Sequence, residues 1–328
     1  MPRTTYLFTT AVLAVLVPMF GADNPRVAID ATARSTILLA QIDSAEPSAG
    51  CTSHPRPNRC FVRISGRVTR VLKDARLQGL VPEAFEVEVP RYLNGMVPAG
   101  APWAGWNVEA GQQYLIFSDL TSGLPAMIKS PTGSLMVTDD EDAVADVDLI
   151  LNSGALSLRE QASAASAVIR SPGKPRSLFM SQYAAAILAA GSDADTAQLA
   201  DSIENSRESV FSDMAKGSLL SSLWDRLRQQ DERGENLLRV FVTMTARYLI
   251  GPVKTLDQSQ VKIKPVILRN YLPWILSSER AMVTLRTRLE PGLAGRIREE
   301  AHRMAADDQL PAEYRTRFRQ LLELLSAR

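Results

Sequence analysis

The chain has 328 residues, which is long enough for two domains that each bury a core. Its 45% hydrophobic and 22% charged residues are typical of a soluble globular protein. The formal net charge is +1, so no strong overall field directs the chain to nucleic acid or to an anionic membrane surface.

The first 22 residues have the layout of a secretory signal peptide. Arg3 supplies the positive start, and residues 7–17 are almost wholly apolar or small. This run is too short to span a bilayer comfortably, and no later segment approaches the length of a membrane span. We therefore expect residues 1–22 to be removed, and the mature protein to be periplasmic or secreted without a stable membrane span. Phe20 is large for the position three residues before the expected cut, so the exact cleavage site stays open. A retained N-terminal anchor is the alternative to cleavage.

The two cysteines of the chain, Cys51 and Cys60, enclose a polar stretch that contains two prolines. In an oxidising compartment such a pair is expected to form one local disulfide, which stabilises the fold by roughly 2–3 kcal/mol. A metal site made of both cysteines and His54 is the alternative. Zinc needs three or four protein ligands, however, and the other histidine, His302, is far along the chain. We therefore predict a disulfide, and no metal or other cofactor.

Residues 23–138 are predicted to form a small β-domain. Short stretches that alternate apolar and polar residues, or that are apolar on both faces, are separated by turns rich in glycine and proline. Strands are expected at 35–43, 61–72, 84–89, 113–117, 126–129 and 134–138. The second stretch contains Gly66, where we expect a bend. Five or six short strands with no helix among them favour a five-stranded OB-like barrel, with a sandwich as the alternative.

Three stretches of this β-domain together resemble the netrin module and the tissue inhibitors of metalloproteinases. They are residues 64–69 (Ile-Ser-Gly-Arg-Val-Thr), 85–89 (Phe-Glu-Val-Glu-Val) and 109–117, which end in Gly-Gln-Gln-Tyr-Leu-Ile-Phe. The resemblance covers about residues 35–120 and implies an OB-fold domain. The animal inhibitors have several disulfides and a metal-binding cysteine at the mature N-terminus, and this chain has neither. The resemblance therefore implies a fold, and enzyme inhibition is only an alternative function.

Trp103 and Trp106 lie in a long loop rich in glycine and proline, at residues 93–112. Two aromatic side chains in a loop of a small barrel can stack on a sugar or a peptide, so these two are the candidate binding residues of the chain. The function that is favoured for aromatic residues of this kind, however, is to cover the core of the barrel, since buried aromatic side chains supply much of the stability of a small domain.

Residues 139–328 are predicted to form an α-helical domain. Ser157 and Glu160 have the spacing of a capping box, and apolar residues then recur at helical spacing up to the C-terminus. Helices are expected at 143–151, 157–170, 178–190, 194–206, 208–229, 236–250, 269–276, 278–289, 293–304 and 311–326. An interruption at Gly217 stays open. Helix pairs recur roughly every 35 to 40 residues, which favours a HEAT-like array, with an irregular bundle as the alternative.

Four acidic residues, 139–142, precede the first of these helices. Acidic residues at a helix start complement the helix dipole and can cap its free N–H groups, which is the function we predict for them. A calcium site that also includes Asp146 and Asp148 is the alternative, but the central glycine and closing glutamate of an EF-hand loop are missing. The arginines of residues 280–319 alternate with acids, which indicates a solvated helix face and not a nucleic-acid-binding surface.

Catalytic motifs are absent from the sequence. There is no Gly-x-Ser-x-Gly elbow, no Walker loop, no Gly-x-Gly-x-x-Gly and no His-Glu-x-x-His. A Ser–His–Asp set needs a histidine base, but His54 is inside the predicted disulfide loop and His302 is on a charged helix face. A Ser–Lys dyad and a pair of glycosidase carboxylates have no fixed spacing in the sequence, so both stay open. We predict no catalytic residue.

The sequence thus predicts an α+β protein of two domains, an OB-like β-barrel followed by an α-helical, HEAT-like array. The function that it favours is an exported, non-enzymatic protein that binds a protein or a glycan, with no nucleic-acid partner. The alternatives are an extracellular enzyme inhibitor of the netrin-like type and a hydrolase whose site no motif marks.

The disulfide can be tested on the mature protein purified without reductant. We expect thiol titration under denaturing, non-reducing conditions to find no free thiol, because export permits the Cys51–Cys60 bridge to form and persist. The reduced protein, in which both cysteines react, is the control. Two free thiols in the unreduced sample would contradict the bridge.

Overall fold

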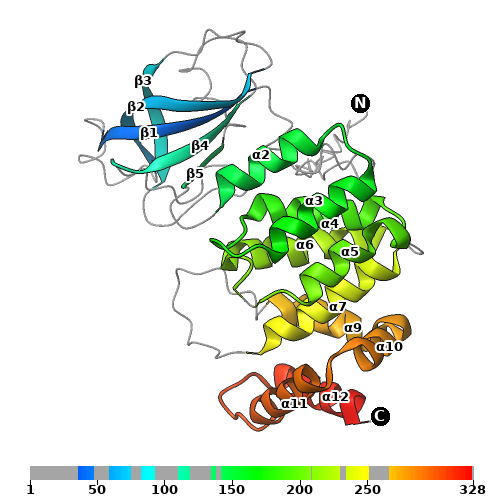
Figure 1. Cartoon of the computed structure of the whole chain (residues 1–328). Helices are drawn as coiled ribbons and strands as arrows, with labels where there is room; N and C mark the ends of the chain where they lie inside the picture. Colours follow the sequence, from blue (N-terminus) through cyan, green and yellow to red (C-terminus); the bar gives the residue numbers. More distant parts are fainter. Residues whose placement is uncertain are drawn as a thin grey trace, which may run out of the picture.

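The chain folds into an antiparallel β-sheet followed by a stack of α-helices (Figure 1). The computed structural model describes residues 36–47, 59–74, 83–92, 110–118, 134–137, 142–207, 209–229, 234–250 and 266–326. Within these ranges the last strand ends at Val137 and the first helix begins at Ala143. The predicted α+β class is confirmed.

The sheet has the strand order of a Greek key. Its strands are β1 (Thr36–Pro47), β2 (Arg59–Asp74), β3 (Ala84–Tyr92), β4 (Gln113–Ser118) and β5 (Ser134–Val137). The order is β3-β2-β1-β4-β5 and all pairs are antiparallel, so β4 returns to lie beside β1 on the side away from β2. Among the described strands no pairing joins β3 to β5, so the sheet is open and the predicted closed barrel is not seen. The strand expected at 126–129 lies outside the described residues.

Strand β1 lies at the centre of the sheet and is buried on both faces. Leu38, Ala40 and Ile42 are buried on one face, where the sheet has a core of its own. Ile37 and Leu39 point to the other face and belong to the same cluster of buried side chains as the helices, together with Leu115 of β4. The sheet and the first helices therefore share apolar core, and the division into two separate domains stays a prediction.

Three register shifts between β1 and β2 curve this pair of strands. Each shift leaves one residue without a partner on the opposite strand. The three residues are Leu72 and Thr69 in β2 and Asp43 in β1. A bulge of this kind bends and twists a strand. The Thr69 hydroxyl donates a hydrogen bond of 3.2 Å to the carbonyl of Leu39, and Leu72 packs against the helical core. The bulges thus help to turn one end of β2 toward the helices.

The helices lie close to the positions that the apolar periodicity predicts. They are α2 (Ala143–Ser153), α3 (Leu158–Arg170), α4 (Leu178–Ala190), α5 (Asp193–Glu204), α6 (Asp213–Gln229), α7 (Glu235–Leu249), the π-helix η2 (Ile267–Tyr271), α9 (Leu272–Ser277), α10 (Glu279–Arg288), α11 (Pro291–Ala305) and α12 (Ala312–Ser326). Gly217 lies inside α6 and does not interrupt it. The π-helix was not expected from the sequence. No helix in the described ranges is both long and apolar enough to cross a membrane.

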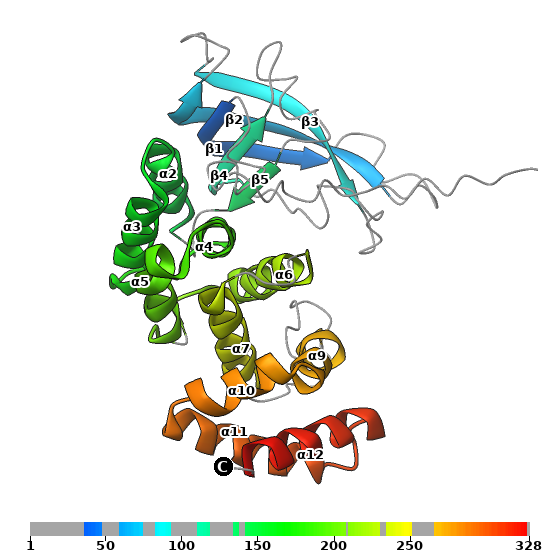
Figure 2. The same cartoon turned by 90° about the vertical axis from the view of Figure 1, so that its right-hand side faces the viewer.

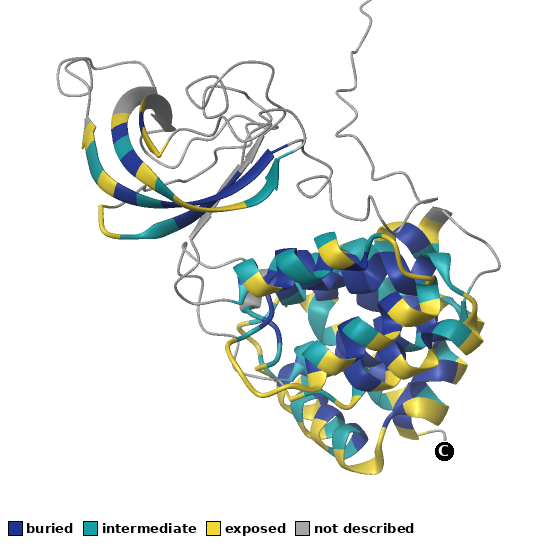
Figure 3. Cartoon of the chain, turned by 45° about the horizontal axis from the view of Figure 1, so that its top comes forward, coloured by how far each residue is buried: buried dark blue, intermediate teal, exposed yellow. Residues whose placement is uncertain are grey.

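Alternate helices stack in two rows (Figure 2). In one row α3 packs on α5, α5 on α7 and α7 on α10. In the other row α2 packs on α4 and α4 on α6, and contacts of α3 with α4 and of α6 with α7 join the rows. Stacking of each unit on its neighbours is the arrangement of helical-repeat proteins. The buried residues lie where the helices face one another and along the central strands (Figure 3).

Gly66 allows a close approach between strands of the sheet. It lies opposite Phe85 of β3, and its own position in β2 is buried. A methyl group added at Gly66 would come within 2.6 Å of the Gln41 carbonyl oxygen and 2.9 Å of the Phe85 ring. Real Cβ atoms do not approach backbone so closely, so glycine is required here for Phe85 to cover β2.

We expect Gly66→Ala to lower the free energy of unfolding by about 1–3 kcal/mol, because the added methyl overpacks a backbone position that cannot move aside. The matched control is Gly295→Ala in α11, where nothing lies within 4 Å of the added methyl. There, alanine should be neutral or stabilise by up to about 1 kcal/mol, since it favours helix over glycine. Urea denaturation measures both. Equal effects of the two substitutions would contradict the close approach.

Candidate functional site

The predicted binding and disulfide residues fall mostly outside the described residues. Trp103, Trp106 and Cys51 are in the stretches that the structure does not describe. For Cys60 only the backbone is described, in β2 opposite Arg91 of β3. The disulfide and the tryptophan loop therefore stay predictions. Of the two histidines, only His302 is in the described part, where it is exposed on α11.

Of the four acidic residues predicted to cap α2, the structure describes Asp142. Asp142 occupies the N-cap position, but its side chain makes no capping hydrogen bond. It binds the guanidinium of Arg176 instead, so the prediction that it caps the helix is wrong. The two acids of the calcium alternative have separate protein partners, since Asp148 pairs with Arg70 of β2 at 2.7 Å and Asp146 is turned toward α4. Residues 139–141 lie outside the described residues.

Asp146 is fully buried where α2 meets the N-terminus of α4. Its Oδ2 accepts hydrogen bonds from the backbone N–H of Ser177 at 2.7 Å and from the Ser177 hydroxyl at 2.8 Å. Ser177 is the N-cap residue of α4 but does not cap that helix with its own side chain. A carboxylate from α2 therefore serves the free N–H end of α4, where the helix dipole also favours a negative charge.

Arg176 completes this group of residues, which we call the Arg176 junction (Asp142, Asp146, Arg176 and Ser177). Its guanidinium is 6% exposed, pairs with Asp142 and lies 3.5 Å from Oδ1 of Asp146. Its backbone is held as well, because the Arg176 N–H donates to the carbonyl of Val210 and the Ser212 N–H donates to the carbonyl of Arg176. Burial raises the pKa of Asp146 to about 6, against the opposing effect of the Ser177 hydrogen bonds and the Arg176 charge.

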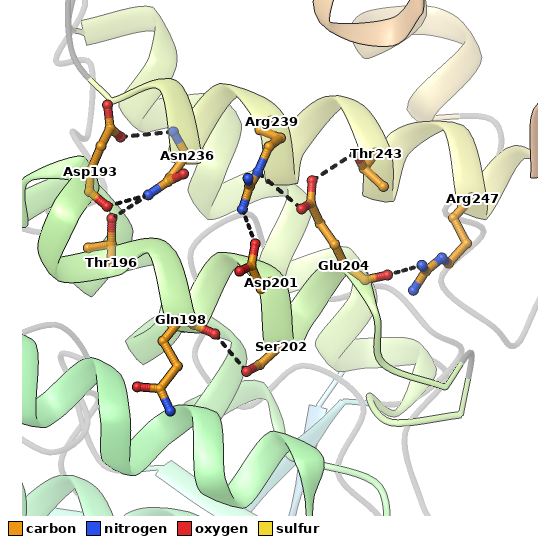
Figure 4. Close-up of polar contacts among 10 residues, drawn as sticks. All are labelled: Asp193, Thr196, Gln198, Asp201, Ser202, Glu204, Asn236, Arg239, Thr243 and Arg247. Carbon is orange, nitrogen blue, oxygen red and sulfur yellow. Dashed lines mark hydrogen bonds and ion pairs between the residues drawn. The ribbon is translucent and has the colours of Figure 1, made fainter. Parts of the chain in front are cut away.

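A second polar contact region joins α5 to α7 (Figure 4). Asp193, at the start of α5, accepts hydrogen bonds from the N–H groups of Glu235 and Asn236 at 3.2 and 2.9 Å. Gly234, the N-cap residue of α7, has no side chain to do this. The Asn236 amide in turn donates to the Asp193 carbonyl and to the Thr196 hydroxyl, at 2.8 and 3.1 Å. The carboxylate of one helix again caps the next helix in its row.

Arg239 is the centre of the same region. Its guanidinium pairs with Asp201 at 2.6 Å and with Glu204 at 3.0 Å, and its side chain is 15% exposed. The other oxygen of Glu204 accepts a hydrogen bond of 3.0 Å from the Thr243 hydroxyl. Burial raises the pKa of Glu204, while the Arg239 charge acts in the opposite direction. Arg247 extends the contacts by donating to the carbonyls of Glu204 and Ser206, at the C-terminal end of α5.

Four aromatic side chains meet where α6, α7, η2 and α9 come together. Trp224 stacks on the buried ring of Phe241 with 5.7 Å between centroids, and Trp274 meets Trp224 edge-on at 5.2 Å. Tyr271 of the π-helix packs against Trp224 and Phe241 at 5.4 Å. The Arg228 guanidinium lies 5.8 Å from the Trp224 ring centre. The cluster is thus part of the core that joins four elements.

These groups are suited to holding helices together and show no arrangement for chemistry. The Ser177 hydroxyl is buried and donates its proton to Asp146, with no histidine or lysine base shown beside it in the described residues. Within the same residues no three His, Cys, Asp or Glu side chains are grouped to hold a metal ion.

Comparison with protein-family models, with curated proteins and with solved structures finds no match to this chain. The sites are therefore interpreted from their own geometry.

The sequence reasoning missed Arg176, Asp193 and Arg239. Each acts on a residue about 30 to 40 positions away, so no local motif marks it. One signal was present in the sequence. Gly234 at the start of α7 has no side chain to cap the helix, and the first turn of α5 contains two acids that could do so from elsewhere in the chain.

Replacing Arg239 tests whether the α5–α7 contacts stabilise the array. We expect Arg239→Met to lower the free energy of unfolding by about 2 kcal/mol, because it leaves the half-buried Glu204 carboxylate without its cation. The loss should shrink as the pH falls, because burial raises the pKa of Glu204 and the protonated acid needs no cation. Arg319→Met, at an exposed position of α12, is the control and should change stability by less than about 0.5 kcal/mol. Urea titrations at pH 7 and pH 4 compare the two variants. Equal losses of stability in Arg239→Met and Arg319→Met would contradict the assignment.

Proposed function

We propose that the chain is an exported, non-enzymatic binding protein in which an OB-like sheet is joined to a HEAT-like helical array. The observation that carries this proposal is the two-row stacking of α3, α5 and α7 against α2, α4 and α6. Proteins built from stacked helices present long, continuous surfaces, and they use these to bind other molecules.

The sheet supports the OB-like part of the proposal in two respects. It has five strands in Greek-key order, and an OB-fold is a five-stranded, partly open Greek-key barrel. Its two outermost strands in the described part, β3 and β5, are the pair whose contact would close such a barrel. Ligands of OB-folds bind at the face of β2 and β3 and at the loops that join β1 to β2 and β4 to β5. Trp103 and Trp106 follow β3 in the chain, in its connection to β4, so a binding loop there would extend this usual ligand face.

Export is supported by the sequence of residues 1–22 and by the spacing of Cys51 and Cys60. The partner is a protein or a glycan, since either can stack on exposed tryptophan rings. The inhibitor and hydrolase alternatives have no supporting observation among the described residues.

The double variant Trp103→Ala/Trp106→Ala tests the binding loop. We expect its melting temperature to stay within about 2 °C of the wild type, because the rings bind a partner and do not fill the core. We also expect it to lose either its formaldehyde-crosslinked protein adduct in cells or its co-sedimentation with an insoluble cell-wall glycan, and the assay that responds identifies the partner class.

Trp224→Ala is the control for a tryptophan of the core, and it should lower the free energy of unfolding by about 3 kcal/mol or more. If the double variant is destabilised to the same degree, Trp103 and Trp106 are core residues and the binding loop is wrong. If the wild type gives neither an adduct nor co-sedimentation, the binding function itself is contradicted.

A further inference from the structure

The Arg176 junction contains two carboxylates and one guanidinium. Asp142 and Asp146 are one helical turn apart on α2, and both pair with Arg176. Arg176 is 6% exposed and Asp146 is fully buried. Because arginine stays protonated in proteins, the group has a net charge of −1 whenever both acids are ionised.

Within the junction itself, Arg176 is the one cation for these two carboxylates. The groups that face Asp146 are Arg176 and Asp142, which are charged, and the uncharged Ser177. Asp148, two residues further along α2, points elsewhere and pairs with Arg70 of β2. An unbalanced negative charge away from water favours uptake of a proton by the more buried acid. Asp146, whose pKa burial raises to about 6, is that acid.

The junction also connects the parts of the fold. Asp146 links α2 to Ser177, the N-cap residue of α4, and the Arg176 backbone is hydrogen-bonded to Val210 and Ser212, just before α6. Helix α2 is in turn tied to the sheet through Asp148 and Arg70. Any change in charge at Asp146 therefore acts on the position where the sheet-bearing helix meets the rest of the array.

We propose that the Arg176 junction is a proton-dependent latch between α2 and α4. When Asp146 binds one proton from solvent, the junction becomes a neutral group in which Arg176 pairs with Asp142. Helix α2, with the sheet attached to it, is then held more firmly on α4. When Asp146 releases the proton to solvent, the buried charge of −1 returns and the latch weakens.

The direction of the pH effect follows from comparing the folded and open states. In the open state Asp146 is solvated and titrates at its ordinary value of 3.8, whereas in the folded state it holds its proton up to about pH 6. The closed latch is favoured below that pH. Its stability falls as the pH rises from about 4 to 6, and then levels off.

Hydrogen exchange of the full-length mature protein at pH 5.0 and 7.5 tests the latch. After correction for the intrinsic effect of pH, we expect amides of α2 and of the first turn of α4 to open about tenfold less often at pH 5.0. In Asp146→Asn this difference should disappear, because asparagine cannot ionise. The control is Asp148→Asn, which removes the same charge from the same helix and should keep the difference.

A second measurement decides the matter if Asp146→Asn does not fold. The carboxyl carbon of Asp146 in the wild-type protein can be titrated by NMR, and its midpoint is expected near pH 6. A midpoint below about 4.5 overturns the proposal. So does a pH dependence of opening that is the same in Asp146→Asn as in the wild type.

Discussion

The helical array depends on how the free N–H groups at helix starts are satisfied. An α-helix begins with N–H groups that have no partner inside the helix. In α4 and α7 the N-cap residue supplies no acceptor, and an aspartate from the helix on which each one stacks does so instead. Asp146 of α2 serves α4, and Asp193 of α5 serves α7. Each of these two contacts fixes how far one helix is shifted along its neighbour. The Asp146 contact does so in one row of helices and the Asp193 contact in the other.

Local signals in the sequence were reliable and distant ones were not. The capping box of Ser157 and Glu160 is present as predicted, because both residues belong to the same helix turn. Ser192 caps α5 in the same local way, since its hydroxyl accepts a hydrogen bond from the N–H of Asp195 three residues later. Asp142 has the sequence signature of a cap as well, yet it binds Arg176, which comes from a loop some 30 residues later. Packing decides which donor an acid serves, and packing is not visible in the spacing of residues along the sequence.

The strands show the same limit. Alternation located β1 to β4 to within a few residues, but the observed strands extend further, because pairing with a neighbour continues past the apolar residues. Strand β3 runs through Pro90 to Tyr92, which is possible at an outer strand where one side of the backbone needs no partner. That β1 would be buried on both faces could not be predicted, since its second face is covered by helices that come later in the chain.

The position of β1 has a consequence for the order in which the fold can form. The helices contact helices that are near in sequence, and such contacts form fast. Strand β1, in contrast, needs β4, since Ile37 pairs with Phe117 and Gln41 with Gln113. Until those residues have been synthesised, one edge of β1 lacks its partner strand. Its face toward the helices stays uncovered for longer, because the helices come later in the chain. The first described strand of the sheet is therefore open to aggregation during synthesis, although residues 36–40 and 42 are buried in the finished fold.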